Sequence, residues 1–334
     1  MMTTAQLETF KRDGVVVLPN FIGEAQVDQW TEEYWRFMQA DPADPATWAA
    51  KQPMFDLNEK FGTRHASNLD LAQGQNFRPG ALDRSIPRLT DLPQVQRLAE
   101  QLGGGNTEAP FPFDGHLIAR FPEHGKAWEP PAGTHLDGYG PNGWTGGYNH
   151  GFGTVAYLND IDETHGAFTY WPQSHRSCHQ FFAENPGTID GSFRQLKAGE
   201  DRFAATKGSA WEDFWAREPH ASRGGPNSRG NGVCVAGKKG DLVVWHGWLQ
   251  HANSANAGTF PRLALFGSFR NAAMENSGPP VHWPYRSPPD KSELRYEIPA
   301  LDDMWKFWGE DVRACGGDEE VAAMALRSGG AARL

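Results

Sequence analysis

The sequence predicts a mainly β protein, in which one domain of short strands has helices packed against it. Glycine and proline account for 38 and 24 of the 334 residues and separate many short apolar runs, a pattern that favours short strands over long helices. Apolar residues follow helical spacing near the two ends of the chain, whereas strand-like runs fill residues 106–271. A hydrophobic fraction of 39% is sufficient for a substantial core.

Residues 1–105 are expected to support the strands with helices. Thr4 is placed to cap the first helix and Gly14 to end it. The second helix is amphipathic, because apolar side chains recur along one of its faces. The expected elements are a helix over Ala5–Arg12, a buried strand over Val15–Leu18, and helices over Glu24–Met38 and Leu92–Leu102.

Residues 106–271 are expected to form the β core, interrupted by a polar insert over 178–232. Its strands are predicted at His116–Phe121, Thr154–Asn159, Phe168–Trp171, Asp241–His246 and Arg262–Arg270. Residues 272–334 are expected to wrap the surface, with a proline-rich stretch followed by helices over Asp303–Trp308 and Glu319–Arg327. Neither a repeat nor a linker of disordered composition divides the chain, so 1–334 is predicted to be one domain.

Charge and composition exclude several classes of protein. A formal net charge of −10 argues against a nucleic-acid partner, which requires a basic surface. No apolar run approaches the roughly 20 residues that cross a bilayer, and no secretory signal is evident. The 3 cysteines lie far apart, which argues against a disulfide framework or a cysteine-based zinc site. We therefore expect a cytoplasmic protein that acts on a small molecule, and leave its oligomeric state open.

The first candidate for chemistry is His135-Leu136-Asp137, which glycines flank on both sides. At the end of a strand, residues i and i+2 point to the same face, so the imidazole and the carboxylate converge. They supply two of the three ligands in the 2-His-1-carboxylate arrangement that binds Fe(II) and leaves open positions. The alternative is a His/Asp pair that is hydrogen-bonded locally within a turn.

The third ligand would be a histidine brought back by a later strand, and two histidines are candidates. His246 lies inside an apolar strand, where a core role with satisfied hydrogen bonds is favoured, whereas His251 follows the turn after that strand. Arg262 then opens the next apolar strand and needs a partner, because an unpaired buried charge is costly. A dicarboxylate that chelates iron at one end would supply that partner at its other end, in the two-bonded geometry that guanidinium favours.

These residues, with three further segments in the same order, resemble a known family. The segments are Phe10–Phe21, Gly166–Arg176 and Gly240–Trp245, and together with the candidate ligands they resemble the phytanoyl-CoA dioxygenase-like group of Fe(II)/2-oxoglutarate dioxygenases. The resemblance implies a double-stranded β-helix (jelly roll) core with supporting N-terminal and C-terminal helices. Two departures are Gln173, where the family usually has glycine, and the length and polarity of 178–232.

The resemblance also implies a set of roles. His135, Asp137 and His251 would bind Fe(II), and Arg262 would hold the distal carboxylate of 2-oxoglutarate, with O2 as the oxidant. Asn253 and Tyr157 stand where family members contact the co-substrate, and the ordinary alternative is that each bonds only to backbone. A carboxylate at the second ligand position, where related halogenases have glycine or alanine, resembles the hydroxylating branch.

Substrate contacts are expected from two places. The insert Tyr139–Gly153 follows the metal motif and is rich in glycine, so it is expected to act as a lid whose Trp144 and Tyr148 cover the substrate; the alternative is a surface loop anchored by one tryptophan. His116 and Arg120 share one strand face and are candidates to point inward. His175 is expected only to shape a loop.

The sequence thus predicts an Fe(II)- and 2-oxoglutarate-dependent oxygenase that hydroxylates, or otherwise oxidises, a C–H bond of a small molecule. Two alternatives remain at this point. One is a jelly-roll protein that binds a small molecule without catalysis, and the other is a zinc hydrolase that uses the same two histidines and aspartate.

Overall fold

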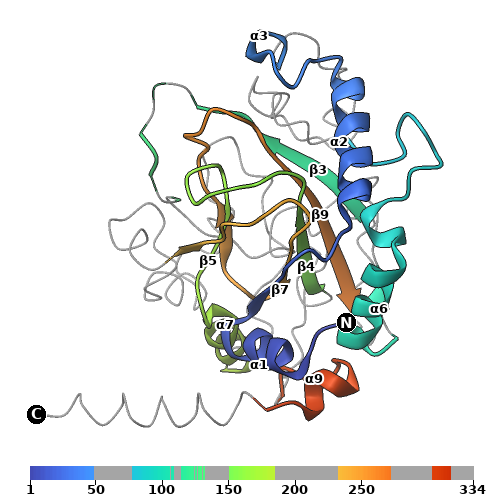
Figure 1. The fold of residues 1–334 in the computed structure, drawn as a ribbon. Coiled ribbons are helices and arrows are strands. Elements are labelled where there is room, and N and C mark those ends of the chain that lie inside the picture. Colours follow the sequence, from blue (N-terminus) through green and yellow to red (C-terminus); the bar gives the residue numbers. More distant parts are fainter. Residues whose placement is uncertain are drawn as a thin grey trace, which may run out of the picture.

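Two antiparallel sheets form the framework of the computed structural model (Figure 1). The structure describes residues 1–48, 77–105, 107–108, 114–123, 125, 127–129, 131, 150–184, 232–271 and 303–316, and every statement below refers to these residues. The larger sheet has the strand order β1-β7-β4-β9-β2, and β3 also pairs with β9; the smaller sheet has the order β6-β5-β8. The mainly β double-stranded β-helix predicted from the sequence is confirmed.

Six of the described strands overlap the predicted runs, whereas the short strands at Thr107–Glu108, Val233–Cys234 and His251–Asn253 were not predicted. The larger sheet contains β1 (Val15–Leu18), β2 (Thr107–Glu108), β3 (Asp114–Arg120), β4 (His150–Tyr157), β7 (Leu242–His246) and β9 (Arg262–Asn271). The smaller sheet contains β5 (Phe168–Tyr170), β6 (Val233–Cys234) and β8 (His251–Asn253). Strand β1, predicted as part of the N-terminal support, belongs to the sheet itself, because it pairs with β7.

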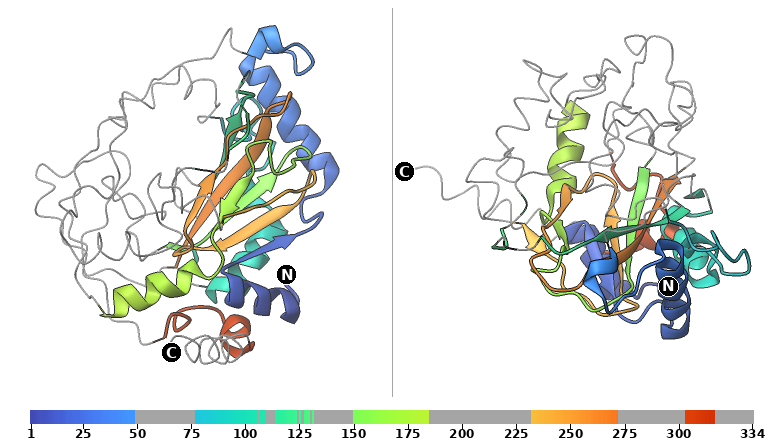
Figure 2. Two further views of the ribbon diagram at one scale, coloured as in Figure 1. Left: turned by 90° about the vertical axis from the view of Figure 1, so that its left-hand side faces the viewer. Right: turned by 90° about the horizontal axis from the view of Figure 1, so that it is seen from above.

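Helices cover one face of the larger sheet, as Figure 2 (left) shows for α2 and α6. The helices are α1 (Thr4–Asp13), α2 (Glu24–Met38), α3 (Pro45–Trp48), α6 (Pro93–Gly103), α7 (Ser174–Glu184) and α9 (Glu310–Ala314), with a 3-10 turn at Leu89–Asp91. In the described residues, no helix combines the length and apolar character required to span a bilayer.

Helix α1 begins one residue earlier than predicted. Thr3 is the capping residue, not Thr4, because its hydroxyl accepts a hydrogen bond from the backbone N–H of Gln6. The side chain of Gln6 accepts in turn from the backbone N–H of Thr3, which completes a capping box. The helix ends at Gly14, whose φ of 79° lies in the left-handed region that glycine favours.

Side chains of the larger sheet alternate between two cores. On β7, Leu242 and Val244 face the helices and pack in the larger core, whereas Val243 and Trp245 face the smaller sheet. This alternation follows from the two-residue period of a strand. The space between the two sheets is therefore lined by the odd-numbered residues of β7, and His246 lies on the helix-covered side.

Three expectations about the elements are wrong. Asp303–Trp308 forms turns instead of a helix, and a helix begins only at Glu310. The turns are sufficient to bury the aromatic side chains of Trp305 and Trp308. The last four residues of the expected lid, His150–Gly153, belong to β4. His175 lies in the first turn of α7, not in a loop. The predicted helix Glu319–Arg327 and the proline-rich stretch lie outside the described residues.

Gly153 gives a test of the packing between the sheets. The indole of Trp245 lies across its Cα, so that a Cβ at this position would collide with the ring. We expect Gly153→Ala to lower the free energy of unfolding by about 2–3 kcal/mol through overpacking. Gly316→Ala is the matched control, because only Glu8 lies within 4 Å of a Cβ there. Urea denaturation of both variants would measure the difference, and equal stabilities would contradict the described position of Trp245.

Candidate active site

His251 is held in the orientation expected of a metal ligand. Its side chain is buried on β8, and its Nδ1 lies 2.9 Å from the carbonyl oxygen of Leu249. A carbonyl oxygen only accepts, so Nδ1 carries the proton and Nε2 keeps the lone pair that a metal requires. The ring packs against Phe168 and Trp245, with centroids 5.4 and 5.2 Å away.

His246 has a different environment, as its position inside the strand predicted. Its Nδ1 accepts a hydrogen bond of 3.0 Å from the backbone N–H of Trp248, and its ring stacks on Trp308 at 4.9 Å. His175 lies beside it, and the Nε2 of His175 is 3.1 Å from the carbonyl oxygen of Lys11. Both rings therefore help to join α1 and α7 on the helix-covered side.

Arg262 is a buried cation with no carboxylate beside it in the described part of the chain. Its side chain is 1% exposed, and its guanidinium makes one weak hydrogen bond, from Nη2 to Oδ1 of Asn253 at 3.5 Å. Nε has no partner, and Cζ lies 5.4 Å from the centroid of Phe266. Burial, reinforced by the charge of Arg120, lowers the pKa of Arg262 to about 9, which still leaves it protonated at pH 7.

Among the residues that the structure describes, no anion accompanies the Arg262 guanidinium. Burying a charged group without an ion pair is costly, and native structures rarely leave one uncompensated. The guanidinium lies on the strand that follows His251, and Asn253 on β8 connects the two. The residues present thus fit a carboxylate bound beside Arg262 and Asn253.

Asn253 and Tyr157 differ in how their polar groups are used. Asn253 is half-buried, and its side chain contacts Arg262 directly. Tyr157 donates its hydroxyl proton to the carbonyl of Val235 at 2.9 Å and accepts from the backbone N–H of Phe168 at 3.2 Å. Burial raises the pKa of Tyr157 to about 12, so this hydroxyl stays protonated. The co-substrate contact of Tyr157 stays a prediction.

The two strand residues proposed to point inward do share the inner face of β3. His116 is paired in register with Phe266, and Arg120 with Arg262. Both side chains are half-buried, whereas Leu117 and Ala119 between them face the helix-side core. The remaining predicted site residues, namely His135, Asp137, Trp144 and Tyr148, lie outside the described residues. Within the described ranges, no three metal-binding side chains cluster.

Sequence reasoning missed Trp245 as a wall of this site. It is adjacent in sequence to His246, which was assigned to the core, yet it points the opposite way and contacts His251. The signal was present in the strand period, because residues 243 and 245 share the face opposite to 246. The pairing of Arg120 with Arg262 had no such signal, since it depends on the register of two strands far apart in sequence.

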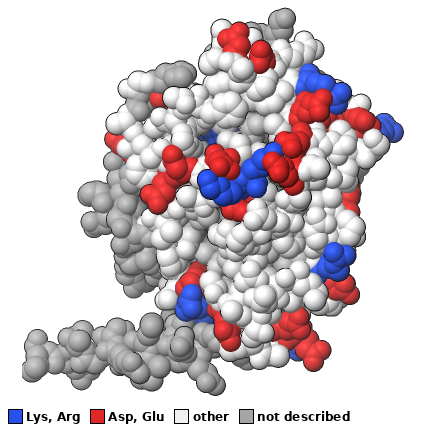
Figure 3. All heavy atoms as spheres, in the orientation of Figure 1, with Lys and Arg blue, Asp and Glu red and all other residues white. Residues whose placement is uncertain are grey.

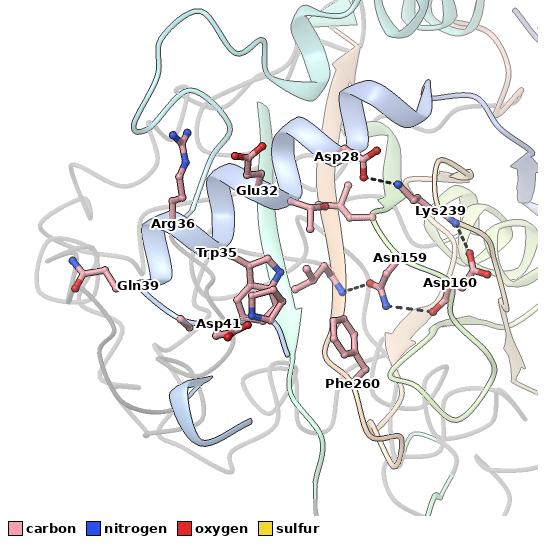
Figure 4. Close-up of a pocket in the computed structure, with 15 residues that line it drawn as sticks. Asp28, Glu32, Trp35, Arg36, Gln39, Asp41, Asn159, Asp160, Lys239 and Phe260 are labelled. Carbon is pink, nitrogen blue, oxygen red and sulfur yellow. Dashed lines mark hydrogen bonds and ion pairs between the residues drawn. The ribbon is translucent and has the colours of Figure 1, made fainter. Parts of the chain in front are cut away.

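A groove of about 960 Å³ lies on the other side of the larger sheet, where Trp35 and Phe260 form its apolar wall (Figure 4). None of the predicted site residues lines it. Exposed ion pairs border it, with Lys239 Nζ 2.5 Å from Asp28 and Lys238 Nζ 2.9 Å from Asp160. Figure 3 shows acidic and basic side chains intermingled across this face.

The described part of the chain thus combines a double-stranded β-helix core with a buried arginine and a histidine whose Nδ1 is held by a backbone carbonyl. The family model for phytanoyl-CoA dioxygenase matches residues 10–264, more than half of the chain, and the protein belongs to this family. Fe(II), 2-oxoglutarate and O2 are the cofactor and co-substrates of this family, as the sequence motifs implied. No curated protein matches the chain.

Several solved structures are similar to this chain. EvdO2 from Micromonospora carbonacea var. aurantiaca, complexed with 2-oxoglutarate, is 20% identical with a TM-score of 0.48, over 81% of this chain and 92% of that one. The epimerase SnoN, in complex with Fe3+, alpha ketoglutarate and nogalamycin RO, is 16% identical with a TM-score of 0.47, over 80% and 83%. HygX from Streptomyces hygroscopicus, with nickel, 2-oxoglutarate and hygromycin B bound, is 16% identical with a TM-score of 0.43, over 80% and 87%.

Proposed function

We propose that this protein is an Fe(II)- and 2-oxoglutarate-dependent oxygenase that hydroxylates, or otherwise oxidises, a C–H bond of a small-molecule substrate. The observation that carries the proposal is Arg262, a fully buried guanidinium without a carboxylate partner in the described part of the chain. A dicarboxylate co-substrate supplies the missing charge, whereas neither a zinc hydrolase nor a simple binding protein requires one there.

Each residue has a defined task in this proposal. His251 presents Nε2 to the metal while its Nδ1–H is held by Leu249, and His135 and Asp137 are the other two ligands. Arg262 binds the distal carboxylate of 2-oxoglutarate, and Asn253 orients the guanidinium. Bound iron and 2-oxoglutarate supply the oxidation, in which O2 and 2-oxoglutarate yield succinate and CO2 and one oxygen atom goes to the C–H bond.

The apolar walls of the site keep water away from this reaction. Phe168, Trp245 and Phe266 lie around His251 and Arg262 in the core between the two sheets. A site without water strengthens the ion pair at Arg262 and protects a reactive oxidant from side reactions. His116 on β3, with Trp144 and Tyr148 of the insert, stays a predicted contact of the substrate.

The test uses the full chain, loaded with Fe(II) without oxygen. We expect one iron per chain and, on addition of 2-oxoglutarate, the weak visible charge-transfer band of the chelate. Admission of O2 with a substrate should then yield one succinate per product. Failure to bind iron under reducing conditions would favour a non-catalytic binding protein, and turnover with zinc in the absence of 2-oxoglutarate would favour a hydrolase.

A further inference from the structure

Arg120 and Arg262 form a pair of like charges on the inner face of the larger sheet. They occupy opposed positions of the β3–β9 ladder, and opposed side chains of an antiparallel pair point to the same face with Cβ atoms about 5 Å apart. The charge of Arg120 is one of the two causes that lower the pKa of Arg262. Two guanidinium groups are thus close enough to repel each other.

The guanidinium of Arg120 has no hydrogen-bond or ion-pair partner among the described residues, and its Nε is buried. Glu123 raises its pKa from three residues away, but no hydrogen bond or ion pair joins the two side chains. Burial acts more strongly in the opposite direction and lowers the pKa of Arg120. Arg120 is therefore half-buried and, like Arg262, has no ion pair in the described part of the chain; the nearest acidic influence on it is the charge of Glu123.

The position of Arg120 is fixed by its surroundings. Its backbone carbonyl accepts a hydrogen bond of 2.7 Å from Nδ2 of Asn256, in the segment that joins β8 to β9. Its aliphatic stem lies over Gly166, where a Cβ would stand 3.2 Å from Cβ and Cδ of Arg120. The positive φ of 72° at Gly166 favours glycine there and keeps this space open for the arginine.

We propose that Arg120 is a second anchor for the distal carboxylate of 2-oxoglutarate, which it shares with Arg262. This inference rests on the proposed function. One carboxylate has two oxygens and about four lone-pair positions, so it accepts hydrogen bonds from two guanidinium groups. An anion between two cations also removes the repulsion that each exerts on the other.

The sharpest probe is a pair of ligands that differ only in the distal group. 2-Oxoglutarate ends in a carboxylate, and 2-oxopentanoate has the same chain with a methyl group in its place. The dissociation constant of 2-oxopentanoate divided by that of 2-oxoglutarate isolates the contribution of the distal carboxylate. Both constants are measured by calorimetry on the anaerobic Fe(II)-loaded protein. We expect Arg120→Leu to reduce this ratio roughly tenfold, with iron stoichiometry unchanged. Arg36→Leu, on the exposed face of α2, is the matched control.

A double-mutant cycle with Arg262→Leu tests whether the two arginines share one anion. If the two arginines share one anion, the double variant should lose less binding free energy for 2-oxoglutarate than the sum of the losses in the two single variants. The reason is that the second substitution acts on a site that the first has already weakened. Melting temperatures without ligand give an independent readout, because removing one of two repelling charges should leave the stability of Arg120→Leu equal to or above that of the wild type. Arg120→Gln, close in size and neutral, is the second variant in case Arg120→Leu folds poorly.

The outcomes separate the two proposals. Wild-type protein that binds no 2-oxoglutarate would overturn the proposed function, and the role of Arg120 with it. Suppose that the wild-type protein binds 2-oxoglutarate and that both Arg120 variants have the same ratio of dissociation constants as the wild type. This result would overturn the shared anchor alone. An unchanged ratio together with a raised KM for the oxidised substrate would place Arg120 in substrate binding instead.

Discussion

Replacing His251 by alanine should abolish iron binding while the fold persists. Loss of a residue that merely orients a ligand lowers metal affinity 10–100-fold, so loss of the ligand itself should cost on the order of a hundredfold or more. The 2.9 Å contact of Nδ1 with the Leu249 carbonyl makes His251 the described histidine best prepared for this role. Iron per chain, measured after anaerobic loading and desalting, should fall close to zero.

His246→Ala is the matched control, five residues earlier in the chain. Its ring packs against Trp305 and Trp308 on the helix-covered side, so truncation should cost about 2–4 kcal/mol of stability, as large-to-small changes in cores do. Iron stoichiometry should stay at one per chain. The reverse result, with iron lost in His246→Ala and kept in His251→Ala, would show that the wrong histidine has been assigned.

Arg262→Leu should weaken 2-oxoglutarate binding by at least about tenfold, because truncating one partner of a buried charge pair costs 2–5 kcal/mol. Iron binding should be unaffected, since the guanidinium contacts Asn253 and Phe266 and no metal ligand of the described chain. The leucine also removes a buried charge that has no carboxylate beside it among the described residues. The ligand-free protein should therefore be at least as stable as the wild type.

Arg262→Lys separates charge from geometry in the same experiment. A lysine keeps the positive charge but lacks the planar fork that makes two parallel bonds to a carboxylate, so an intermediate affinity is expected. Titration of 2-oxoglutarate into the anaerobic, iron-loaded protein measures the dissociation constant of the wild type, Arg262→Leu and Arg262→Lys. An unaltered dissociation constant in Arg262→Leu would remove the main support for the proposed co-substrate site.

Local signals were sufficient to predict the N-terminal elements. The strand Val15–Leu18 and the helix Glu24–Met38 have the predicted bounds, because Gly14 and Pro19 flank the strand and the apolar spacing marks the extent of the helix. His246 was assigned to the core because it lies inside an apolar strand, and its Nδ1 does accept a hydrogen bond from the backbone N–H of Trp248. The choice of His251 as the metal ligand stays a prediction.

What the sequence could not predict depends on contacts between distant segments. The pairing of Arg120 with Arg262 is set by strand register, and no local pattern encodes it. The four residues assigned to the end of a lid join β4 because β7 and β9 provide hydrogen-bonding partners on both sides of that strand. At Asp303–Trp308, aromatic spacing suggested a helix, but burial of those rings against α1 is achieved by turns.

The pairing of β1 with β7 has a consequence for how the protein is synthesised. Val15 pairs with Trp245 and Leu18 with Leu242, so the ladder joins residues more than 220 positions apart. At about 5–20 residues per second, a ribosome needs roughly 10–45 s to reach β7 after β1 has emerged. During that interval the apolar segment Val15–Leu18 has no strand to pair with, and unpaired strand edges promote aggregation. Expression at a lower temperature, or with additional chaperones, should therefore raise the yield of folded protein.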